Sequence, residues 1–372
     1  MTADPRVRSS NPVDGRDDDG ADSLHLAILD RGDGRQLRLF SRGARSYRCY
    51  DGLPPVTGAG VHLRQHPLTG EWIAYSTARQ GRTMLPSAHE CPLCPMISAA
   101  PVTDVPVDDY EVAIFSNRFA ALLPEPGPVP ELDVMTRPGR GLCEVISYSA
   151  DHAASFASIG EDRIALLIDA LAVRVPEIMQ DPDIAWVLPF ENRGREIGVT
   201  LDHPHGQIYA LSHLPGNIRQ MAEGFRGGNP LAGLATTIPE QLKLAENDAG
   251  IAFVPPWARY PFEVWVVPHE AVPDMSHMPV PARRDFAALL ATAAQRLDAL
   301  FGAPMPYTFG WQTAPRGYED IFHFHCVFQP LRRARDKMKF LASVEQFTGF
   351  FLVDLPPEQA ADRLNGRVSA DG

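Results

Sequence analysis

The sequence predicts an α+β fold built from two fused copies of one unit, and three observations lead to that prediction. Each half of the chain contains one long segment with apolar residues at helical spacing, at residues 161–179 and 281–302. Each half runs strand, helix, strand, strand, and each closes on a His-x-His segment. The pattern recurs after roughly 120 residues, which is too long for a solenoid and suits a duplicated α+β unit.

The first half supplies the predicted elements in a regular order. Residues 24–30 and 36–42 predict a hairpin across the turn sequence RGDGR, and residues 70–76, 111–117 and 143–149 predict three further strands. The helix predicted over residues 161–179 carries Glu161 and Asp162 in its first turn, where acidic side chains are favourable. Residues 184–194 and 197–211 then predict two strands.

The second half repeats this order. Strands are predicted at residues 262–270, 305–315 and 321–331, with the helix at 281–302 after the first of them, whereas glycine and proline interrupt residues 216–250. We therefore expect a disordered leader at residues 1–22, a first half at 23–215 and a second half at 216–372.

Composition excludes several classes of protein. The 372 residues carry a formal net charge of -12 without a compensating basic run, which argues against a nucleic-acid partner. No apolar run is long enough to span a membrane, and the N-terminus lacks the apolar core of a signal peptide. Five cysteines in such a chain favour a reducing cytoplasm, where thiols are available to a metal.

The segment ECPLCP indicates a metal site. Cys91 and Cys94 flank a tight turn that brings both thiolates to one ion, as in zinc knuckles. A redox pair normally begins a helix, and here the flanking prolines and the absence of a helical pattern disfavour that alternative. Two more ligands are needed for a tetrahedral site. His152 and His203 are the candidates, although His152 also fits a residue at a helix N-terminus.

The segment LDHPHGQIYA holds the candidate reactive residues. In a strand, positions 203, 205 and 207 share one face, so two imidazoles and an amide lie side by side, unless the segment is merely a polar strand end. A neutral imidazole attacks phosphorus and later leaves, provided that its other nitrogen has a fixed acceptor. We assign His203 to the metal and His205 to the substrate. Gly206 admits close approach of a phosphate, and Gln207 donates to it.

The sequence resembles the galactose-1-phosphate uridylyltransferase family, a transferase branch of the histidine-triad superfamily. The segments that carry the resemblance are LDHPHGQIYA, FENRG, ECPLCP, FSNRFAALLP, PPWARYPFEVWVVP and FHFHCVFQPL. The resemblance runs from about residue 64 to residue 364. It implies two fused histidine-triad-like halves forming one long antiparallel sheet with helices packed on it. It also implies one zinc ion per chain, a homodimer, and transfer of a uridylyl group from UDP-glucose to galactose 1-phosphate through a covalent uridylyl-histidine.

The resemblance also assigns roles to single residues. It makes His205 the nucleophile and Gln207 its phosphate partner, at a position where hydrolytic relatives carry a third histidine. Its zinc ligands match Cys91, Cys94, His152 and His203. The residues that match substrate contacts are Arg79, Arg82, Asn117, Asn192, Thr200, Lys339, Phe340 and Glu345, the last three partly across the dimer interface.

This sequence departs from the family pattern at several positions. Some members hold a second metal on a glutamate, a histidine and the second His-x-His pair. Here His323 and His325 remain, but the other two positions are Met221 and Gln312, so we expect no second metal. Phe351 replaces a glutamine that touches the nucleotide, and His66 stands where an asparagine is usual.

Two other functions remain open from the sequence. One is a related nucleotide-sugar phosphorylase or nucleotidyltransferase that uses another sugar or base through the same covalent histidine. The other is a non-catalytic, zinc-stabilised nucleotide-binding protein. The intact His205 disfavours the second alternative, because a pure binder needs no unligated imidazole.

Overall fold

The computed structural model describes residues 7–9, 23–31, 35–52, 60–81, 84–96 and 102–369. The chain forms two compact units, each assembled from separate segments. The first contains residues 1–155, 169–189 and 200–223, and the second contains 156–168, 190–199 and 224–372. The division expected between residues 215 and 216 stays a prediction.

Among the described residues, twelve strands form one sheet in the order β1-β2-β3-β6-β8-β10-β9-β14-β15-β13-β12-β11. The expected α+β fold, with one long antiparallel sheet and helices packed on it, is confirmed. Strand β9 (Trp186–Arg193) contributes its first residues to the first unit and its last residues to the second.

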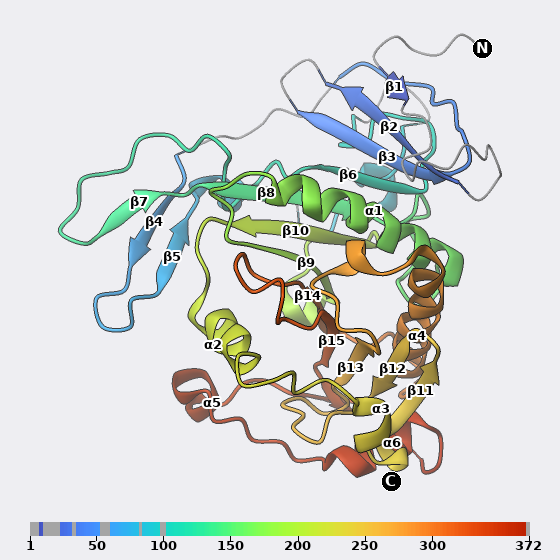
Figure 1. Cartoon of the computed structure of the whole chain (residues 1–372). Helices are drawn as coiled ribbons and strands as arrows, with labels where there is room; N and C mark the ends of the chain where they lie inside the picture. The colour runs from blue at the N-terminus through green and yellow to red at the C-terminus, as the bar shows by residue number, and fades with distance from the viewer. Residues whose placement is uncertain are drawn as a thin grey trace. The chain divides into compact units, whose positions relative to one another are not determined.

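The first unit contains the strands that carry the site (Figure 1). They are β1 (Val7–Ser9), β2 (Leu24–Asp30), β3 (Gln36–Arg42), β6 (Val112–Ser116), β8 (Gly141–Ser147) and β10 (His205–Leu211). The predicted hairpin of β2 and β3 is confirmed, with Leu24 opposite Arg42 and Asp30 opposite Gln36. Within the expected leader, β1 pairs with β2, so these three residues are ordered against the sheet. The rest of the leader lies outside the described residues.

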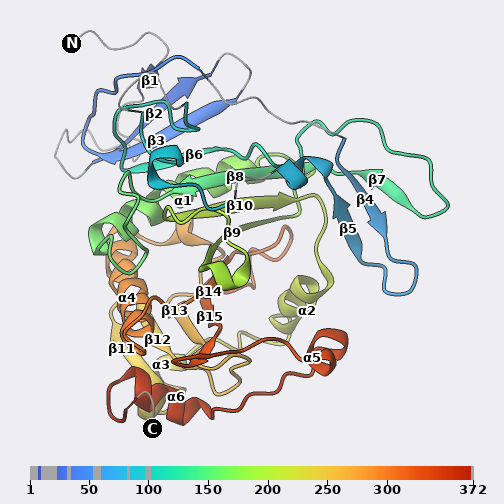
Figure 2. The same cartoon turned by 180° about the vertical axis from the view of Figure 1, so that it is seen from behind.

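A smaller three-stranded sheet stands apart from these strands in both views (Figures 1 and 2). It consists of β5 (Trp72–Tyr75), β4 (His62–Gln65) and β7 (Thr136–Pro138). The strand predicted at residues 70–76 is therefore present, but it pairs with β4 instead of joining the large sheet.

The second unit places one long helix against its strands. The strands of this unit are β14 (Tyr307–Gln312), β15 (His325–Pro330), β13 (Val264–Pro268), β12 (Gly250–Phe253) and β11 (Lys243–Asn247). Helix α4 (Val280–Ala299) runs along β11, β12 and β13 (Figure 1). It buries Phe286, Leu290 and Leu297, which lie on one side of the helix and fill the unit's core.

Shorter elements complete the described chain. They are η1 (Thr77–Gly81), η2 (Ala88–Glu90), η3 (Arg195–Ile197), α2 (Gly216–Gly224), α3 (Leu234–Thr237), η4 (Glu240–Leu242), η5 (Met275–His277), β16 (Arg332–Ala334), β17 (Lys337–Met338), α5 (Ser343–Thr348) and α6 (Pro357–Leu364). No helix of the described residues is long and apolar enough to cross a membrane.

Helix α1 (Glu161–Met179) has the bounds that its sequence predicts. In the first unit, Arg174 of α1 forms two hydrogen bonds to the carboxylate of Glu144 on β8, at 2.9 and 2.8 Å. Both side chains are buried. A bidentate pair of this kind fixes the register of helix on strand.

The strand predicted over residues 197–211 is too long. Strand β10 begins only at His205, because Gly198 adopts a left-handed conformation with φ 76° and Pro204 has no N–H to donate to a neighbouring strand. His203 therefore lies in the loop before β10. The expected shared face holds for positions 205 and 207 and not for 203.

Candidate metal centre and active site

Four side chains converge in the first unit. The thiols of Cys91 and Cys94 lie just after η2, His152 lies in a turn after β8, and His203 precedes β10. Their four ligand atoms all lie within 4.8 Å of one another. The Sγ atom of Cys94 is 3.5 Å from Nδ1 of His152 and 3.5 Å from Nδ1 of His203. The sequence prediction that these four residues meet is thus confirmed.

The orientation of His203 is set by groups outside the cluster. Its Nε2 atom lies 2.8 Å from the backbone oxygen of Ser149, which can only accept a hydrogen bond. Nε2 therefore carries the proton, and Nδ1 is left with its lone pair toward the cysteines. The hydroxyls of Ser147 and Tyr110 lie 3.1 and 3.0 Å from the same Nε2. Partners of this kind fix the tautomer of metal-binding histidines.

The cluster has the chemistry of a structural zinc site. Zinc bonds of about 2.0–2.3 Å in a tetrahedron place ligand atoms about 3.5 Å apart, which is the distance from Sγ of Cys94 to each histidine nitrogen here, and all four ligand atoms lie within 4.8 Å of one another. The adjacent Cys94 thiol and the His203 ring hold the pKa of Cys91 well below its ordinary value, which favours the thiolate, the form that binds a metal. Cys91 and His203 are buried at 1 % exposure each, beside the core residues Leu93 and Tyr110. The residues present fit the metal.

His205 is the first residue of β10, and its ring is oriented by its neighbour. Its Nδ1 atom lies 2.8 Å from the backbone oxygen of His203. Because that oxygen only accepts, Nδ1 is the protonated nitrogen and Nε2 has a lone pair. Burial lowers the pKa of His205, so the ring is neutral at neutral pH. A neutral imidazole that keeps one lone pair has the properties of a nucleophile.

His205 opens into a pocket of about 600 Å³, part of it open to solvent, which we call the His205 pocket. Both polar and apolar residues line it. Its polar residues are Arg79, Asp104, Asn117, Arg118, Thr200, His205 and Gln207, and its apolar residues are Pro92, Leu93, Phe115, Phe119, Val145 and Leu201. Five of the expected site residues therefore meet in one place, with apolar surface for a flat ring beside groups suited to phosphate.

Contacts within this pocket orient its polar groups. Asn117 donates to Oε1 of Gln207 at 3.3 Å, and Arg79 donates to the hydroxyl of Tyr209 at 3.0 Å. Gln207 and Tyr209 alternate along β10 with buried Ile208, as half-buried residues on the side of His205. Gly206 is buried on the opposite side, with its backbone paired to Ile146 of β8.

The other expected substrate contacts either belong to the second unit or lie outside the described residues. Arg82 lies outside the described residues. Asn192 belongs to the second unit, where it is paired with Thr308 across β9 and β14. Lys339, Phe340 and Glu345 also belong to the second unit.

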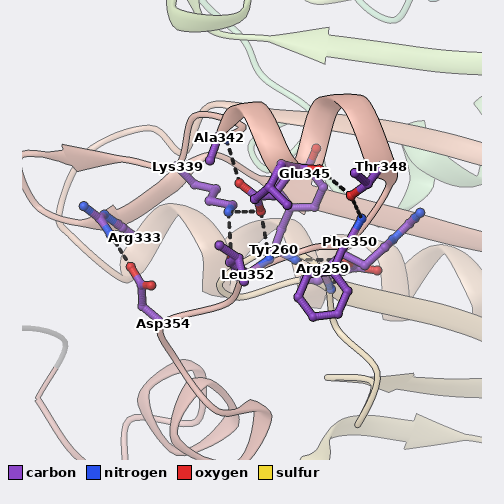
Figure 3. A network of polar contacts seen from close by, with 12 residues as sticks. Arg259, Tyr260, Arg333, Lys339, Ala342, Glu345, Thr348, Phe350, Leu352 and Asp354 are labelled. Carbon is purple, nitrogen blue, oxygen red and sulfur yellow. Dashed lines mark hydrogen bonds and ion pairs between the residues drawn. The ribbon is translucent and has the colours of Figure 1, made fainter.

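Lys339 and Glu345 form an internal ion pair that shapes the C-terminal segment (Figure 3). Glu345 also accepts from the backbone N–H groups of Ala342 and Leu352, at 2.7 and 2.9 Å. The Lys339 ammonium and these two bonds hold the pKa of Glu345 down, to about 2. Phe340 is 70 % exposed, in contrast to this buried pair.

The second His-x-His pair repeats part of the local geometry of the first. Strand β15 begins at His325, whose Nδ1 lies 2.8 Å from the backbone oxygen of His323. His323 contacts Asn229 and the backbone oxygen of Pro268, at 3.0 and 2.9 Å. Gln312 lies opposite His325 on β14. These partners are amides and carbonyls, and no carboxylate of the described residues joins them as a metal ligand.

Some residues that serve the site give no signal in the sequence. Tyr110, Ser147 and Ser149 hold His203 through a hydroxyl or a backbone oxygen, and none of them belongs to a motif. The ion pair of Arg118 with Asp104, at 3.1 Å, also lines the His205 pocket. Desolvation raises the pKa of Asp104 although Arg118 opposes the shift.

The structure thus combines an α+β fold, a cysteine–histidine cluster that could hold a metal ion, and an oriented imidazole beside it, which is an arrangement suited to an enzyme with a histidine nucleophile. Family models named "Galactose-1-phosphate uridyl transferase" match this chain over residues 57–215 for the N-terminal domain and 239–371 for the C-terminal domain. The chain belongs to the galactose-1-phosphate uridylyltransferase family.

Individual relatives agree with this assignment. The galactose-1-phosphate uridylyltransferase of Thermotoga maritima is 34% identical over 317 residues, which cover 82% of this chain and 98% of the relative. The Streptomyces lividans protein of the same name is 33% identical over 354 residues, covering 89% and 95%. A solved uridylyltransferase structure is similar with a TM-score of 0.73 at 26% identity, covering 82% of this chain and 97% of the other.

Proposed function

We propose that this protein transfers a uridylyl group from UDP-glucose to galactose 1-phosphate by a ping-pong reaction. The observation that carries the proposal is the orientation of His205, whose Nδ1–H is held by the His203 carbonyl while Nε2 is available at the pocket. Membership of the family supplies the substrates, because the relatives carry the name of this transferase.

In the first step Nε2 of His205 attacks the α-phosphorus of UDP-glucose. A P–N bond forms, the P–O bond to glucose 1-phosphate breaks, and glucose 1-phosphate leaves as the anion. In the second step a phosphate oxygen of galactose 1-phosphate attacks the same phosphorus, the P–N bond breaks, and neutral His205 is restored. Gln207 and Arg79 line the pocket, which supports a role for both in stabilising the negative charge on phosphate.

We assign one zinc ion per chain to Cys91, Cys94, His152 and His203. Bound there, the ion crosslinks three loops and stabilises the fold. The loop that carries His203 also carries the carbonyl that orients His205. The cluster thereby connects metal binding to the position of the nucleophile.

We propose that the protein is a homodimer and that it is located in the cytoplasm. The five cysteines all lie within the described residues and form no disulfide, as expected of a reducing compartment. The segment after Lys339 exposes Phe340, Phe347 and Phe350, which suits an interface. Light scattering on the purified protein tests this assembly, and a monomeric mass at micromolar concentration would reject it.

Intact-protein mass spectrometry after incubation with UDP-glucose tests the proposed reaction. We expect an adduct with the mass of one uridylyl group that disappears when galactose 1-phosphate is added. The His205→Ala variant is the matched control and should form no adduct. An adduct formed from ADP-glucose and not from UDP-glucose would mean that the donor substrate is a different nucleotide sugar. The absence of an adduct with both compounds would reject covalent transfer.

A further inference from the structure

A chain of hydrogen bonds fixes the direction of two amide side chains beside His205. The backbone N–H of Phe119 donates to Oδ1 of Asn117 at 2.9 Å. A backbone N–H can only donate, so the atom facing it must be the oxygen of the Asn117 amide. The Nδ2 group of Asn117 is thereby forced to point the other way, toward Gln207.

The next contact transmits this direction. Nδ2 of Asn117 donates to Oε1 of Gln207 at 3.3 Å. Since Nδ2 has no lone pair to offer, Gln207 must present its oxygen to Asn117. Its Nε2 group, with two protons, is then the part of the amide that remains for the His205 pocket, which both residues line.

Backbone hydrogen bonding to β8 holds both of these residues. Asn117 directly follows β6, and its own N–H donates to the backbone oxygen of Cys143 on β8 at 2.9 Å. Strand β8 pairs on its other side with β10, where Val145 lies opposite Gln207. One amide thus lies just after β6 and the other on β10, and both strands have β8 as a neighbour.

We propose that Asn117 is a positioning residue that sets the amide of Gln207 so that its N–H donates to the transferring phosphoryl group. This role rests on the proposed uridylyl transfer. Without Asn117 the Gln207 amide is free to turn by 180°, which would direct an oxygen at a phosphate oxygen and replace attraction by repulsion. Asn117 would then act on the rate of phosphoryl transfer through Gln207, beside any contact that it makes to the substrate as a lining residue of the His205 pocket.

The decisive test is a double-mutant cycle on single-turnover uridylylation at saturating UDP-glucose. Asn117→Asp keeps the acceptor for Phe119 and the side-chain shape but replaces the donor facing Gln207 by an acceptor. Gln207→Met removes the amide. We expect each single variant to slow adduct formation by at least about tenfold, as removal of a transition-state donor does. In the Gln207→Met background, Asn117→Asp should change the rate less than about twofold.

Asn117→Ala is the second variant, since Asp also adds a charge near phosphate. It should show the same loss of rate and the same lack of effect in the Gln207→Met background. UDP binding, measured by calorimetry, separates the two ways in which Asn117 can act: a weaker affinity for UDP reports a contact to the nucleotide, whereas the rate at saturating UDP-glucose reports the orientation of Gln207. Zinc content and circular dichroism establish that each variant is folded.

Additive effects in the cycle, or a loss confined to UDP binding, would overturn the role of Asn117. That failure is distinct from failure of the proposed function, because the wild-type protein would still form the uridylyl adduct. Absence of the adduct in the wild-type protein would instead reject the transfer chemistry, and this role with it.

Discussion

The Nδ1 atom of His205 lies 2.8 Å from the backbone oxygen of His203, and Nδ1 of His325 lies 2.8 Å from that of His323. The same hydrogen bond thus orients the first residue of β10 and of β15. What differs is the surrounding surface: His205 lines a pocket, whereas His325 is 1 % exposed and stacks on Trp265 at 4.8 Å between ring centroids. An oriented imidazole becomes a nucleophile only where a substrate can reach it.

The first prediction concerns the pH dependence of the uridylylation step. Burial lowers the pKa of His205 below its usual 6.5, so the ring stays neutral as the pH falls through that value. The rate of adduct formation from UDP-glucose should therefore hold between pH 7.5 and 6.5 and decline only at lower pH. Rapid-quench measurements give this profile, with zinc content checked at each pH. An acid limb with an apparent pKa at or above 6.5 would contradict the prediction.

Replacing the nucleophile should remove turnover without unfolding the protein. His205→Gly is expected to lower the rate of uridylyl exchange by roughly 10⁴-fold or more, because the covalent route is lost. Added imidazole should restore part of the activity by occupying the vacated space. The exposed His277 provides the matched control, and His277→Ala should retain wild-type exchange. Near wild-type exchange by the Gly variant without imidazole would show that the mechanism is not covalent at this residue.

Metal removal should affect both the fold and the activity. Cys91→Ala leaves three ligands and is expected to lose zinc and to lower Tm by roughly 5–10 °C, since structural zinc binding is coupled to folding. Elemental analysis should find one zinc per wild-type chain, and Cys49→Ala, whose thiol lies outside the cluster, should keep it. Two metal ions per wild-type chain would mean that His323 and His325 bind a second ion together with other ligands. The absence of any metal would reject the metal assignment.

Much of the site was predictable because its chemistry lies in short contiguous segments. A Cys-x-x-Cys turn and a His-x-His segment each place two groups within a few residues, so local geometry alone brings them together. The fold class followed in the same way from helical and strand periodicity. The start of β10 was mispredicted, because apolar spacing continues through residues 197–204 whereas Gly198 and Pro204 prevent strand pairing there.

The supporting contacts were not predictable for a different reason. His203 is oriented by a backbone oxygen of Ser149, and every residue carries such an oxygen, so no residue type marks the position. Tyr110 reaches the same ring across 93 positions of sequence. Pairings at that separation depend on which strands become neighbours, which periodicity does not specify.

A buried carboxyl in the second unit should make stability depend on pH. Glu191 is 4 % exposed and accepts from the hydroxyl of Tyr307 at 3.3 Å, and burial raises its pKa from 4.5 to about 8. The folded protein therefore keeps a proton that the unfolded chain releases above pH 4.5. The stabilisation that protonated Glu191 provides is fully present below pH 4.5. It is lost, at up to about 1.4 kcal/mol per pH unit, as the pH rises from there through 8.

Glu191→Gln, which cannot ionise, should remove this dependence. Urea unfolding at pH 5.5, 7 and 8.5 should show the variant gaining stability relative to the wild-type protein as the pH rises. Glu358→Gln, at an exposed position of α6, is the control and should follow the wild-type protein. A constant difference between Glu191→Gln and wild-type stability over this range would mean that Glu191 is ionised in the folded state.

The choice between sugar phosphate and water should depend on Gln207. Gln207→His recreates the His-x-His-x-His pattern of the hydrolytic relatives, on the side of β10 that faces the His205 pocket. A protonated imidazole can donate a proton to a leaving oxygen, which a neutral amide cannot do. The substitution also removes the amide oxygen that accepts from Asn117, unless the new imidazole ring turns a nitrogen toward Asn117 to accept that bond. We therefore expect transfer to galactose 1-phosphate to slow by about tenfold or more, with a larger share of the adduct lost to water.

The ratio of UMP to UDP-galactose formed from UDP-glucose measures this partition directly. Gln207→Met is the control, because it removes the amide without supplying an acid; it should slow transfer but leave the ratio close to that of the wild-type protein. A rise in the ratio for the histidine variant alone would show that the proton, and not the loss of the amide, admits water to the reaction. If a folded and active Gln207→His protein kept the wild-type ratio, access of water would have to be governed by residues other than Gln207.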